Sequence, residues 1–303
     1  MTLVPQHSPA SADATARGVH ESPRRARCAK TAEAVKPYFH DGAMTLYAGD
    51  AHGVLSRLPE RSVDCVVTSP PYYGCRDYGH SCQFGVEPVA KDYVERVRGV
   101  FGEVHRVLAD RGTCWLALGD GYATNPDGSL HGEGQPFSPL ENLLGIPWRV
   151  AFGLQEDGWI LRNAVVWHNP SCAPESVRDR LSLRHEHIFL LVKQRRYHFD
   201  LDLIRSPSDA DLARGGRNPG DVWSIGMTPL DGARFAVFPI ELPLRCIAAG
   251  CPPGGRVLDP FSGAGTTGIA ARRLDRSYIG IDLRADYHDL AVSHLREDER
   301  ARR

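Results

Sequence analysis

The chain has 303 residues and a formal net charge of −1, with 36 Lys and Arg against 37 Asp and Glu. Hydrophobic residues make up 42% and charged residues 24%, which is ordinary for a globular protein. No apolar run approaches the roughly 20 residues of a membrane-spanning helix, and the N-terminus lacks the apolar stretch of a secretion signal. We therefore expect a cytoplasmic protein with no membrane association, built as one large domain with a smaller appended lobe. The charge balance provides no global basic field that would indicate a nucleic-acid partner.

Cysteine and histidine give no clear metal pattern. The eight cysteines contain no Cys-x-x-Cys pair, and Cys65 and Cys114 lie inside apolar runs, where a thiol behaves as a small hydrophobic group. In the triplet His185-Glu186-His187 the two imidazoles share one face of a strand-like segment, but no third ligand is evident. We expect a structural role for these residues and no bound metal.

The elements expected along the chain alternate between strand and helix. Residues 1–38 are rich in Ala, Ser, Pro and Arg without an apolar period, which predicts a disordered tail. The run at 62–67 is continuously apolar, as in buried parallel strands, whereas 92–108 has the apolar spacing of an amphipathic helix. The elements predicted in this first part are strand 44–50, helix 52–58, strand 62–67, helix 92–108, strand 113–118, helix 146–159 and strand 160–167.

The stretch 168–236 differs from its surroundings in having several prolines, a Gly-Gly pair, clustered arginines and only one clear strand, at 187–193. It is therefore predicted to be an inserted lobe. The elements predicted after it are strand 255–259, helix 265–274, strand 277–283 and a final helix. The alternation predicts an α/β fold, a doubly wound, mostly parallel Rossmann-like sheet whose two parts, 39–167 and 237–303, flank the lobe.

A Gly-rich loop joins the strand ending at Asp259 to the following helix. Such a turn lets the backbone approach a ligand closely and directs helix N-terminal N–H groups at it. Asp282 ends the next strand, where a carboxylate binds ribose hydroxyls in folds of this kind. The glycines from Gly263 onward also match a dinucleotide fingerprint, so they do not decide the ligand. Asp259 favours S-adenosylmethionine, because its charge would attract that cationic cofactor and repel a pyrophosphate.

A second loop, Ser69-Pro70-Pro71-Tyr72, follows directly after the apolar strand at 62–67. Its stiff main chain can present carbonyl oxygens to the protons of an amino group conjugated to a base ring, which would free the nitrogen lone pair for methylation. Tyr72 can stack on a base swung out of a duplex, a role that needs the ring and not the hydroxyl. A proline turn with an exposed tyrosine is the alternative.

Four segments together resemble the amino-methyltransferases of bacterial restriction–modification systems: TSPPYYGCRDYG, GTCWLALGD, GIPWRVAFGLQEDGWILR and VLDPFSGAGTTG. The likeness covers about residues 44–295. The motif at Ser69 precedes the Gly-rich loop, which resembles the permuted β group of that family. Ser-Pro-Pro-Tyr, in place of Asp-Pro-Pro-Tyr, resembles the cytosine-N4 members, although Ser can also serve adenine-N6 enzymes.

The resemblance assigns roles residue by residue. It implies a catalytic part at 39–167, target recognition at 168–236 and a cofactor-binding part at 237–303. The residues implied to bind the cofactor are Asp259, Phe261, Gly263, Gly265 and Thr266 at its methionine moiety, Asp282 at its ribose, Asp50 near its adenine and Phe235 beside it. The chain departs from the expected pattern at Asn169 and Arg234, which puts contacts at those two points in doubt.

The implied partner is double-stranded DNA, and a cognate restriction endonuclease is a further partner of such systems; the oligomeric state is not given by the sequence. Seven arginines of the lobe are candidates for DNA contacts: Arg178, Arg180, Arg184, Arg195, Arg196, Arg214 and Arg217. Two alternatives stay open. One is methylation of an RNA amine or a protein amide, because a Pro-Pro-Tyr loop suits any planar amine. The other is a non-catalytic DNA-binding protein with the same fold.

Overall fold

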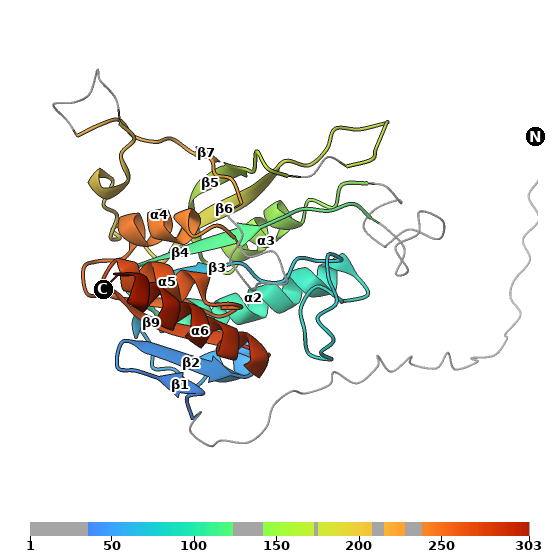
Figure 1. The fold of residues 1–303 in the computed structure, drawn as a ribbon. Helices are drawn as coiled ribbons and strands as arrows, with labels where there is room; N and C mark the ends of the chain where they lie inside the picture. The colour runs from blue at the N-terminus through green and yellow to red at the C-terminus, as the bar shows by residue number, and fades with distance from the viewer. Residues whose placement is uncertain (1–35, 124–141, 173–174, 208–214, 228–237, 303) are drawn as a thin grey trace, which may run out of the picture.

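A computed structural model describes residues 36–123, 142–172, 175–207, 215–227 and 238–302. The described strands form one nine-stranded sheet in the order β1-β2-β9-β8-β3-β4-β6-β5-β7 (Figure 1). The strands are β1 (Phe39–His40), β2 (Met44–Ala48), β3 (Val63–Thr68), β4 (Leu108–Leu118), β5 (Ile160–His168), β6 (His185–Val192), β7 (Val222–Ser224), β8 (Arg256–Asp259) and β9 (Ser277–Asp282).

The central strands of the sheet run parallel. The pairs β2–β9, β9–β8, β8–β3 and β3–β4 are parallel, as is β5–β7. The pairs β1–β2, β4–β6 and β5–β6 are antiparallel. The prediction of an α/β, mostly parallel sheet is confirmed. Parallel strands need crossover helices, and those helices cover both faces of this sheet.

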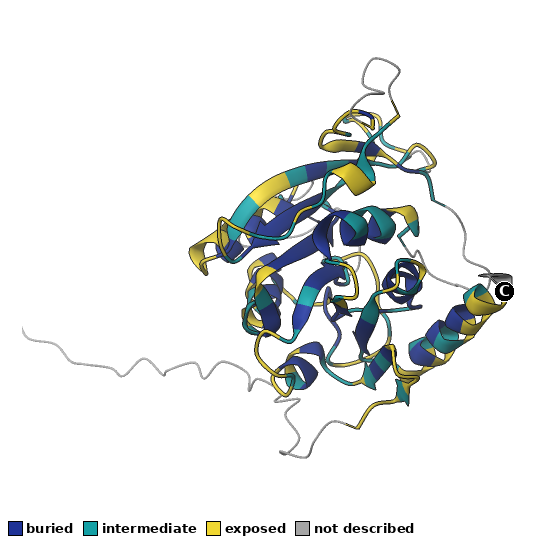
Figure 2. Cartoon of the chain, turned by 90° about the vertical axis from the view of Figure 1, so that its left-hand side faces the viewer, coloured by how far each residue is buried: buried dark blue, intermediate teal, exposed yellow. Residues whose placement is uncertain are grey.

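Six described helices make up the two outer layers. They are α1 (Ala51–Leu55), α2 (Ala90–Val107), α3 (Ile146–Glu156), α4 (Glu241–Gly250), α5 (Thr266–Arg273) and α6 (Ala285–Arg302). Buried residues of α1, α2 and α3 pack in one hydrophobic cluster, and those of α4, α5 and α6 pack in the other. Successive strand residues serve opposite clusters: Val66 belongs to the first, whereas Cys65 and Val67 belong to the second. The buried sheet thus separates two cores (Figure 2).

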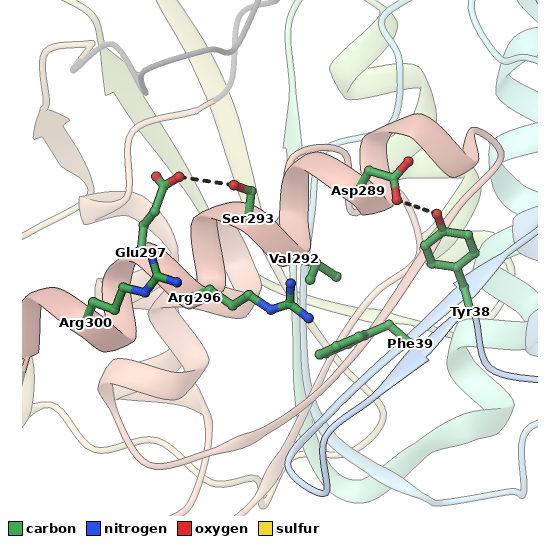
Figure 3. Close-up of a pocket in the computed structure, with 8 residues that line it drawn as sticks. All are labelled: Tyr38, Phe39, Asp289, Val292, Ser293, Arg296, Glu297 and Arg300. Atoms are coloured by element: carbon green, nitrogen blue, oxygen red, sulfur yellow. Dashed lines mark hydrogen bonds between the residues drawn. The ribbon is translucent and has the colours of Figure 1, made fainter.

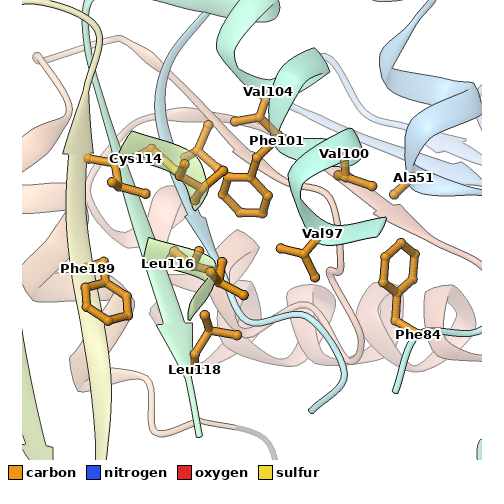
Figure 4. Packing of buried hydrophobic residues seen from close by; sticks show 14 of the residues in the cluster. Ala51, Phe84, Val97, Val100, Phe101, Val104, Cys114, Leu116, Leu118 and Phe189 are labelled. Atoms are coloured by element: carbon orange, nitrogen blue, oxygen red, sulfur yellow. The ribbon is translucent and has the colours of Figure 1, made fainter. Parts of the chain in front are cut away.

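Helix α2 illustrates how the predicted spacing produces packing. Its buried residues Val97, Phe101 and Val104 recur every three or four positions, and they lie over Cys114 and Leu116 of β4 (Figure 4). The 3.6-residue period of the sequence therefore marks the face that this helix turns to the sheet.

Two expected boundaries differ from the structure. The stretch 168–236 is not separate from the sheet: β6 lies between β4 and β5, and β7 pairs with β5. The apolar run of β6 is buried on joining the sheet, which explains its composition. At the N-terminus, Tyr38 falls in the expected tail but its hydroxyl donates to Asp289 at 2.5 Å, and its amide donates to Leu46 at 2.8 Å. Residues 1–35 lie outside the described part of the chain.

Within the described residues, no helix is both long enough and apolar enough to cross a membrane.

Candidate active site

A cavity of about 700 Å³ lies where the parallel strands β2, β3, β8 and β9 end. The carboxyl edge of such a sheet is the usual ligand site of open α/β folds. Ten of the residues predicted from sequence line it: Asp50, Ser69, Pro70, Pro71, Tyr72, Asp259, Phe261, Gly263, Thr266 and Asp282. Phe235 lies outside the described residues. The fold therefore brings both predicted motifs to one cavity.

The Gly-rich loop enters α5 through two glycines in the left-handed region. Gly263 has φ 46°, and Gly265, the residue that caps α5, has φ 83°. Gly265 does not line the cavity. A Cβ there would lie 2.8 Å from the Cβ of Ala291 in α6, so its role is to let helix and loop pack closely. The tight turn directs the N-terminus of α5 at the cavity, where Thr266 is the first helical residue.

Asp259 is buried at the end of β8, with 1% of its surface exposed. One carboxyl oxygen accepts hydrogen bonds from the Thr68 hydroxyl at 2.6 Å and the Phe261 amide at 3.0 Å. The other accepts from the Thr267 hydroxyl at 2.8 Å. Burial nevertheless raises the pKa of Asp259 to about 6, because desolvation penalises the charged form more than these bonds favour it.

Asp282 ends the neighbouring strand β9 and supports the same loop. One of its oxygens accepts from the Gly263 amide at 2.8 Å, and the other accepts from the Arg284 amide at 2.9 Å. Burial raises the pKa of Asp282 as well. Asp50 follows β2, which pairs with β9, and its carboxylate caps α1 by accepting from the Gly53 amide at 2.9 Å.

The loop after β3 is held by side chains from other elements. The hydroxyl of Tyr93, a fully buried residue of α2, donates to the Pro71 carbonyl at 3.0 Å. The Ser69 hydroxyl donates to the Tyr72 hydroxyl at 3.2 Å, and the Tyr72 hydroxyl in turn donates to the carboxylate of Glu186 on β6. The motif itself predicts no role for this tyrosine hydroxyl, which in the structure lies between two partners.

Several residues of the site are assigned no role from the sequence. Thr68, Gly119 and Thr267 lie within the quoted segments, and the two threonines donate to Asp259. Tyr93 and Glu186 come from distant elements outside those segments. One signal for Glu186 is present in the sequence. In a strand, the residue between two histidines that share a face must point to the opposite face, and here that face borders the cavity. Among the described residues, no three His, Cys, Asp or Glu side chains converge as metal ligands.

Five of the seven candidate DNA-contacting arginines divide between the two ends of the strands. Arg178, Arg180 and Arg184 precede β6, whose first residues pair with the carboxyl end of β4, so they lie on the cavity side. Arg195 and Arg196 follow β6 and lie at the opposite edge. Figure 1 shows the β5–β6 connection extending from one edge and the chain after β6 lying near α4 at the other. Arg214 lies outside the described residues.

A second, smaller cavity of about 480 Å³ lies between β1 and the outer face of α6 (Figure 3). It shares no lining residue with the large cavity. Its polar side chains include two hydrogen-bonded pairs: Tyr38 donates to Asp289, and Ser293 donates to Glu297. It contains none of the predicted site residues.

Comparisons with known proteins agree with this arrangement. A family model described as DNA methylase (N6_N4_Mtase) matches residues 63–293. The type II methyltransferase M.Cfr9I of Citrobacter freundii is 44% identical over 84% of this chain and 88% of that protein. The type II methyltransferase M.SmaI of Serratia marcescens is 42% identical over 82% of this chain and 90% of that protein.

Two solved structures share the fold. The PvuII DNA methyltransferase, described as cytosine-N4-specific, superposes with a TM-score of 0.67 at 21% identity, over 85% of this chain and 88% of that one. A putative DNA modification methylase of Thermus thermophilus, solved in complex with S-adenosyl-L-methionine, superposes with a TM-score of 0.58 at 25% identity, over 84% and 93%.

Proposed function

This chain belongs to the N6/N4 DNA methylase family, and we propose that it transfers a methyl group from S-adenosyl-L-methionine to an exocyclic amine of a base in double-stranded DNA. Within that reaction we assign cytosine N4 as the acceptor. The alternative acceptor is adenine N6, which the same family includes.

One observation carries the proposal: the hydroxyl of Thr68 and the carboxylate of Asp259 are 2.6 Å apart. Thr68 directly precedes the Ser-Pro-Pro-Tyr loop, and Asp259 begins the Gly-rich loop. This bond therefore joins a loop suited to hold an amine and a loop suited to hold a cationic donor, 191 positions apart in the sequence. A methyl transfer needs those two groups side by side.

The residues at the Gly-rich loop fit the cofactor. The buried Thr266 hydroxyl has no hydrogen-bond partner among the described residues, although it lines the cavity at the start of α5. Buried hydroxyls usually have partners, so a ligand atom is the expected one. Asp259 and Asp282 supply negative charge for a sulfonium, an amino group or ribose hydroxyls. When bound, S-adenosyl-L-methionine supplies an activated methyl group.

The residues of the other loop fit the amine. Tyr93 already donates to the Pro71 carbonyl, whereas Ser69 and Pro70 line the cavity, and we assign their carbonyl groups as the acceptors for the amine. Two such acceptors would bind the amine protons and localise the nitrogen lone pair, which would form the new N–C bond as the methyl–sulfur bond of the donor breaks. The methylated nitrogen would then release one proton to solvent. The ring of Tyr72 also lines the cavity, where stacking on a base contributes ~1–3 kcal/mol.

The target-recognition role of residues 168–236 is part of this proposal. The β5–β6 connection lies on the cavity side of the sheet, and its arginines can reach phosphates or guanine edges there. Arg180 already forms an ion pair with Glu175 and lies over the ring of Tyr122, 3.7 Å from its centroid, so it serves the loop as well. A cognate restriction endonuclease would cut the same DNA site.

The test is methyl transfer from labelled S-adenosyl-L-methionine to DNA, RNA and protein in parallel. We expect label in DNA alone, and N4-methylcytosine in mass spectra of the digested DNA. Detection of N6-methyladenine would instead identify adenine N6 as the acceptor. Label in RNA or protein alone would reject DNA as substrate, and 5-methylcytosine would reject the mechanism, which attacks an amine and not a ring carbon.

A further inference from the structure

Glu186 lines the cavity from β6, a strand that β3 and β4 separate from β8, which leads into the Gly-rich loop. Glu186 is the second residue of β6 and pairs with Trp167 of β5, which also lines the cavity. The rings of His185 and His187 lie 5.3 Å apart on the other face of the strand. Glu186 therefore lines the cavity, whereas its neighbours His185 and His187 lie on the opposite face of the strand.

Tyr72 is held from three directions. Its main chain belongs to the stiff Pro-Pro turn, its hydroxyl accepts from Ser69 at 3.2 Å, and the same hydroxyl donates to Glu186. The ring edge lies against Gly119 at the end of β4, where a Cβ would be 2.6 Å from the ring. These contacts fix the plane of the ring as well as its place.

Glu186 is half-buried, and its carboxylate accepts a hydrogen bond from the Tyr72 hydroxyl. No described residue forms an ion pair with Glu186, and burial raises its pKa. Enclosing a carboxylate without a cationic partner destabilises a fold. The hydrogen bond from Tyr72 is the contact that Glu186 makes in the cavity, and Tyr72 is the residue proposed to stack on the base.

We propose that Glu186 is a positioning residue that holds the Tyr72 ring in the plane against which the target base stacks. This inference rests on the proposed function, since it assumes that a base enters the cavity. Glu186 acts through the tyrosine hydroxyl and contacts neither the amine nor the methyl donor. The ring alone is therefore insufficient, in contrast to the expectation from the motif.

The test compares Glu186→Ala, Glu186→Gln, Tyr72→Phe and the double variant Tyr72→Phe/Glu186→Ala. Single-turnover methyl transfer is measured on DNA that the wild-type protein modifies. We expect Glu186→Ala and Tyr72→Phe each to lower the rate about ten- to a hundredfold, the range for a hydrogen bond to a charged group. The double variant should be no slower than Tyr72→Phe, because that change already removes the Tyr72–Glu186 hydrogen bond. Glu186→Gln keeps an acceptor and should restore most of the rate.

The controls separate positioning from folding. Dissociation constants for S-adenosyl-L-methionine should stay within about twofold in all four variants, because Glu186 lies outside the cofactor loop. Glu103→Ala, which removes another partly buried glutamate that pairs with Arg106 on α2, should leave the rate unchanged.

Full activity in Tyr72→Phe would overturn the inference, and this variant answers the question even if Glu186→Ala fails to fold. Multiplying effects in the double variant, or a rate in Glu186→Gln as low as in Glu186→Ala, would also overturn it. Failure of the proposed function looks different, since the wild-type protein itself would then transfer no methyl group to DNA.

Discussion

The two halves of the cavity are built in different ways. In the half that we propose for the cofactor, main-chain amides of the Gly-rich loop donate to carboxylates at the ends of β8 and β9: the Phe261 amide donates to Asp259, and the Gly263 amide donates to Asp282. In the target half, the Ser-Pro-Pro-Tyr loop is held by side chains of α2 and β6. Thr68 crosses between the halves through its bond to Asp259.

This difference predicts which substitutions should lower methyl transfer without lowering cofactor affinity. The half proposed for the cofactor depends on backbone conformation and on two carboxylates, the buried Asp259 and the half-buried Asp282. Substitutions there should therefore affect folding and cofactor binding together. The target half depends on side-chain contacts that end in hydroxyl groups. Those contacts can be removed with little loss of packing, so methyl transfer should fall while cofactor affinity remains.

The largest effect is expected for Asp259→Ala. The hydroxyls of Thr68 and Thr267 would lose their buried acceptor, at a cost of ~1–3 kcal/mol each in the free energy of unfolding. Cofactor affinity should fall at least about tenfold, the equivalent of one lost charge contact. Thermal unfolding and calorimetric titration measure the two effects. Asp202→Ala, at an exposed residue, should change neither. An unchanged cofactor affinity in a folded Asp259→Ala would mean that the halves are assigned wrongly.

The next effect in size separates strain from crowding in the cofactor half. Gly265→Ala forces a side chain into φ 83° and places its Cβ 2.8 Å from Ala291. Gly254→Ala has a similar φ of 70° with no atom within 4 Å, so it reports strain alone. We expect about 1 kcal/mol of destabilisation for Gly254→Ala and about 1–3 kcal/mol more for Gly265→Ala. Chemical denaturation of both variants measures the difference, and equal losses would show that α6 yields to the added methyl group.

The pH dependence of cofactor affinity tests whether the charge of Asp259 contributes to cofactor binding. Its pKa is raised to about 6, so below that pH it is increasingly neutral and attracts a cation less. Affinity should fall by up to about tenfold per pH unit below 6. The unfolding free energy should depend on pH in the opposite direction to cofactor affinity. A raised pKa in the folded state stabilises the fold at low pH, and this stabilisation is lost between about pH 3.8 and 6 as the pH rises.

Asp259→Asn is the matched variant for this pH experiment, because it keeps the shape and removes the titration. Calorimetric titrations from about pH 5 to 8, which span the raised pKa, should show a flat profile in that variant. A profile as steep as that of the wild type would assign the titration to another group, with Asp282 the nearest candidate, since its pKa is also raised.

The smallest effect is expected for Tyr93→Phe in the target half. The ring would keep its buried place, and only the hydrogen bond to the Pro71 carbonyl would be lost, a change of ~0.5–1.5 kcal/mol. Methyl transfer should fall several-fold with unchanged cofactor affinity. Tyr38→Phe removes a tyrosine hydroxyl bond beside α6, far from the loop, and should leave the transfer rate alone. A change of cofactor affinity in Tyr93→Phe would show that the halves are coupled.

What could be predicted from sequence follows the same division. The cofactor loop is local: a strand, a glycine turn and a helix stand in order, so Asp259, Gly263 and Thr266 could be assigned together to one site. The target half is non-local. Tyr72 and Glu186 are 114 positions apart, and only the pairing of β6 with β4 and β5 brings them together. Nothing in a linear pattern indicates that pairing.

The same limit explains the boundary at residue 168. The Pro, Gly and Arg residues of the flanking loops are typical of an inserted lobe. The short apolar run of β6 is nevertheless buried in the sheet. The position of β6 therefore follows from its packing between β4 and β5 and not from the composition of the residues around it. Phe235, Arg214 and the tail before residue 36 lie outside the described residues and stay predictions.

The strand order also constrains how the protein can be made. β2 and β3 are synthesised early, yet they are not neighbours in the sheet, because β8 and β9 lie between them. A ribosome must therefore release the last part of the chain, from β8 onward, before these strands can join one sheet. Until then both present open edges, which chaperones protect in other slow-folding sheets. A chain cut before β8 would retain the Ser-Pro-Pro-Tyr loop and the pairing of β3 with β4, but it would lack the strand and the Gly-rich loop that lie on the other side of β3.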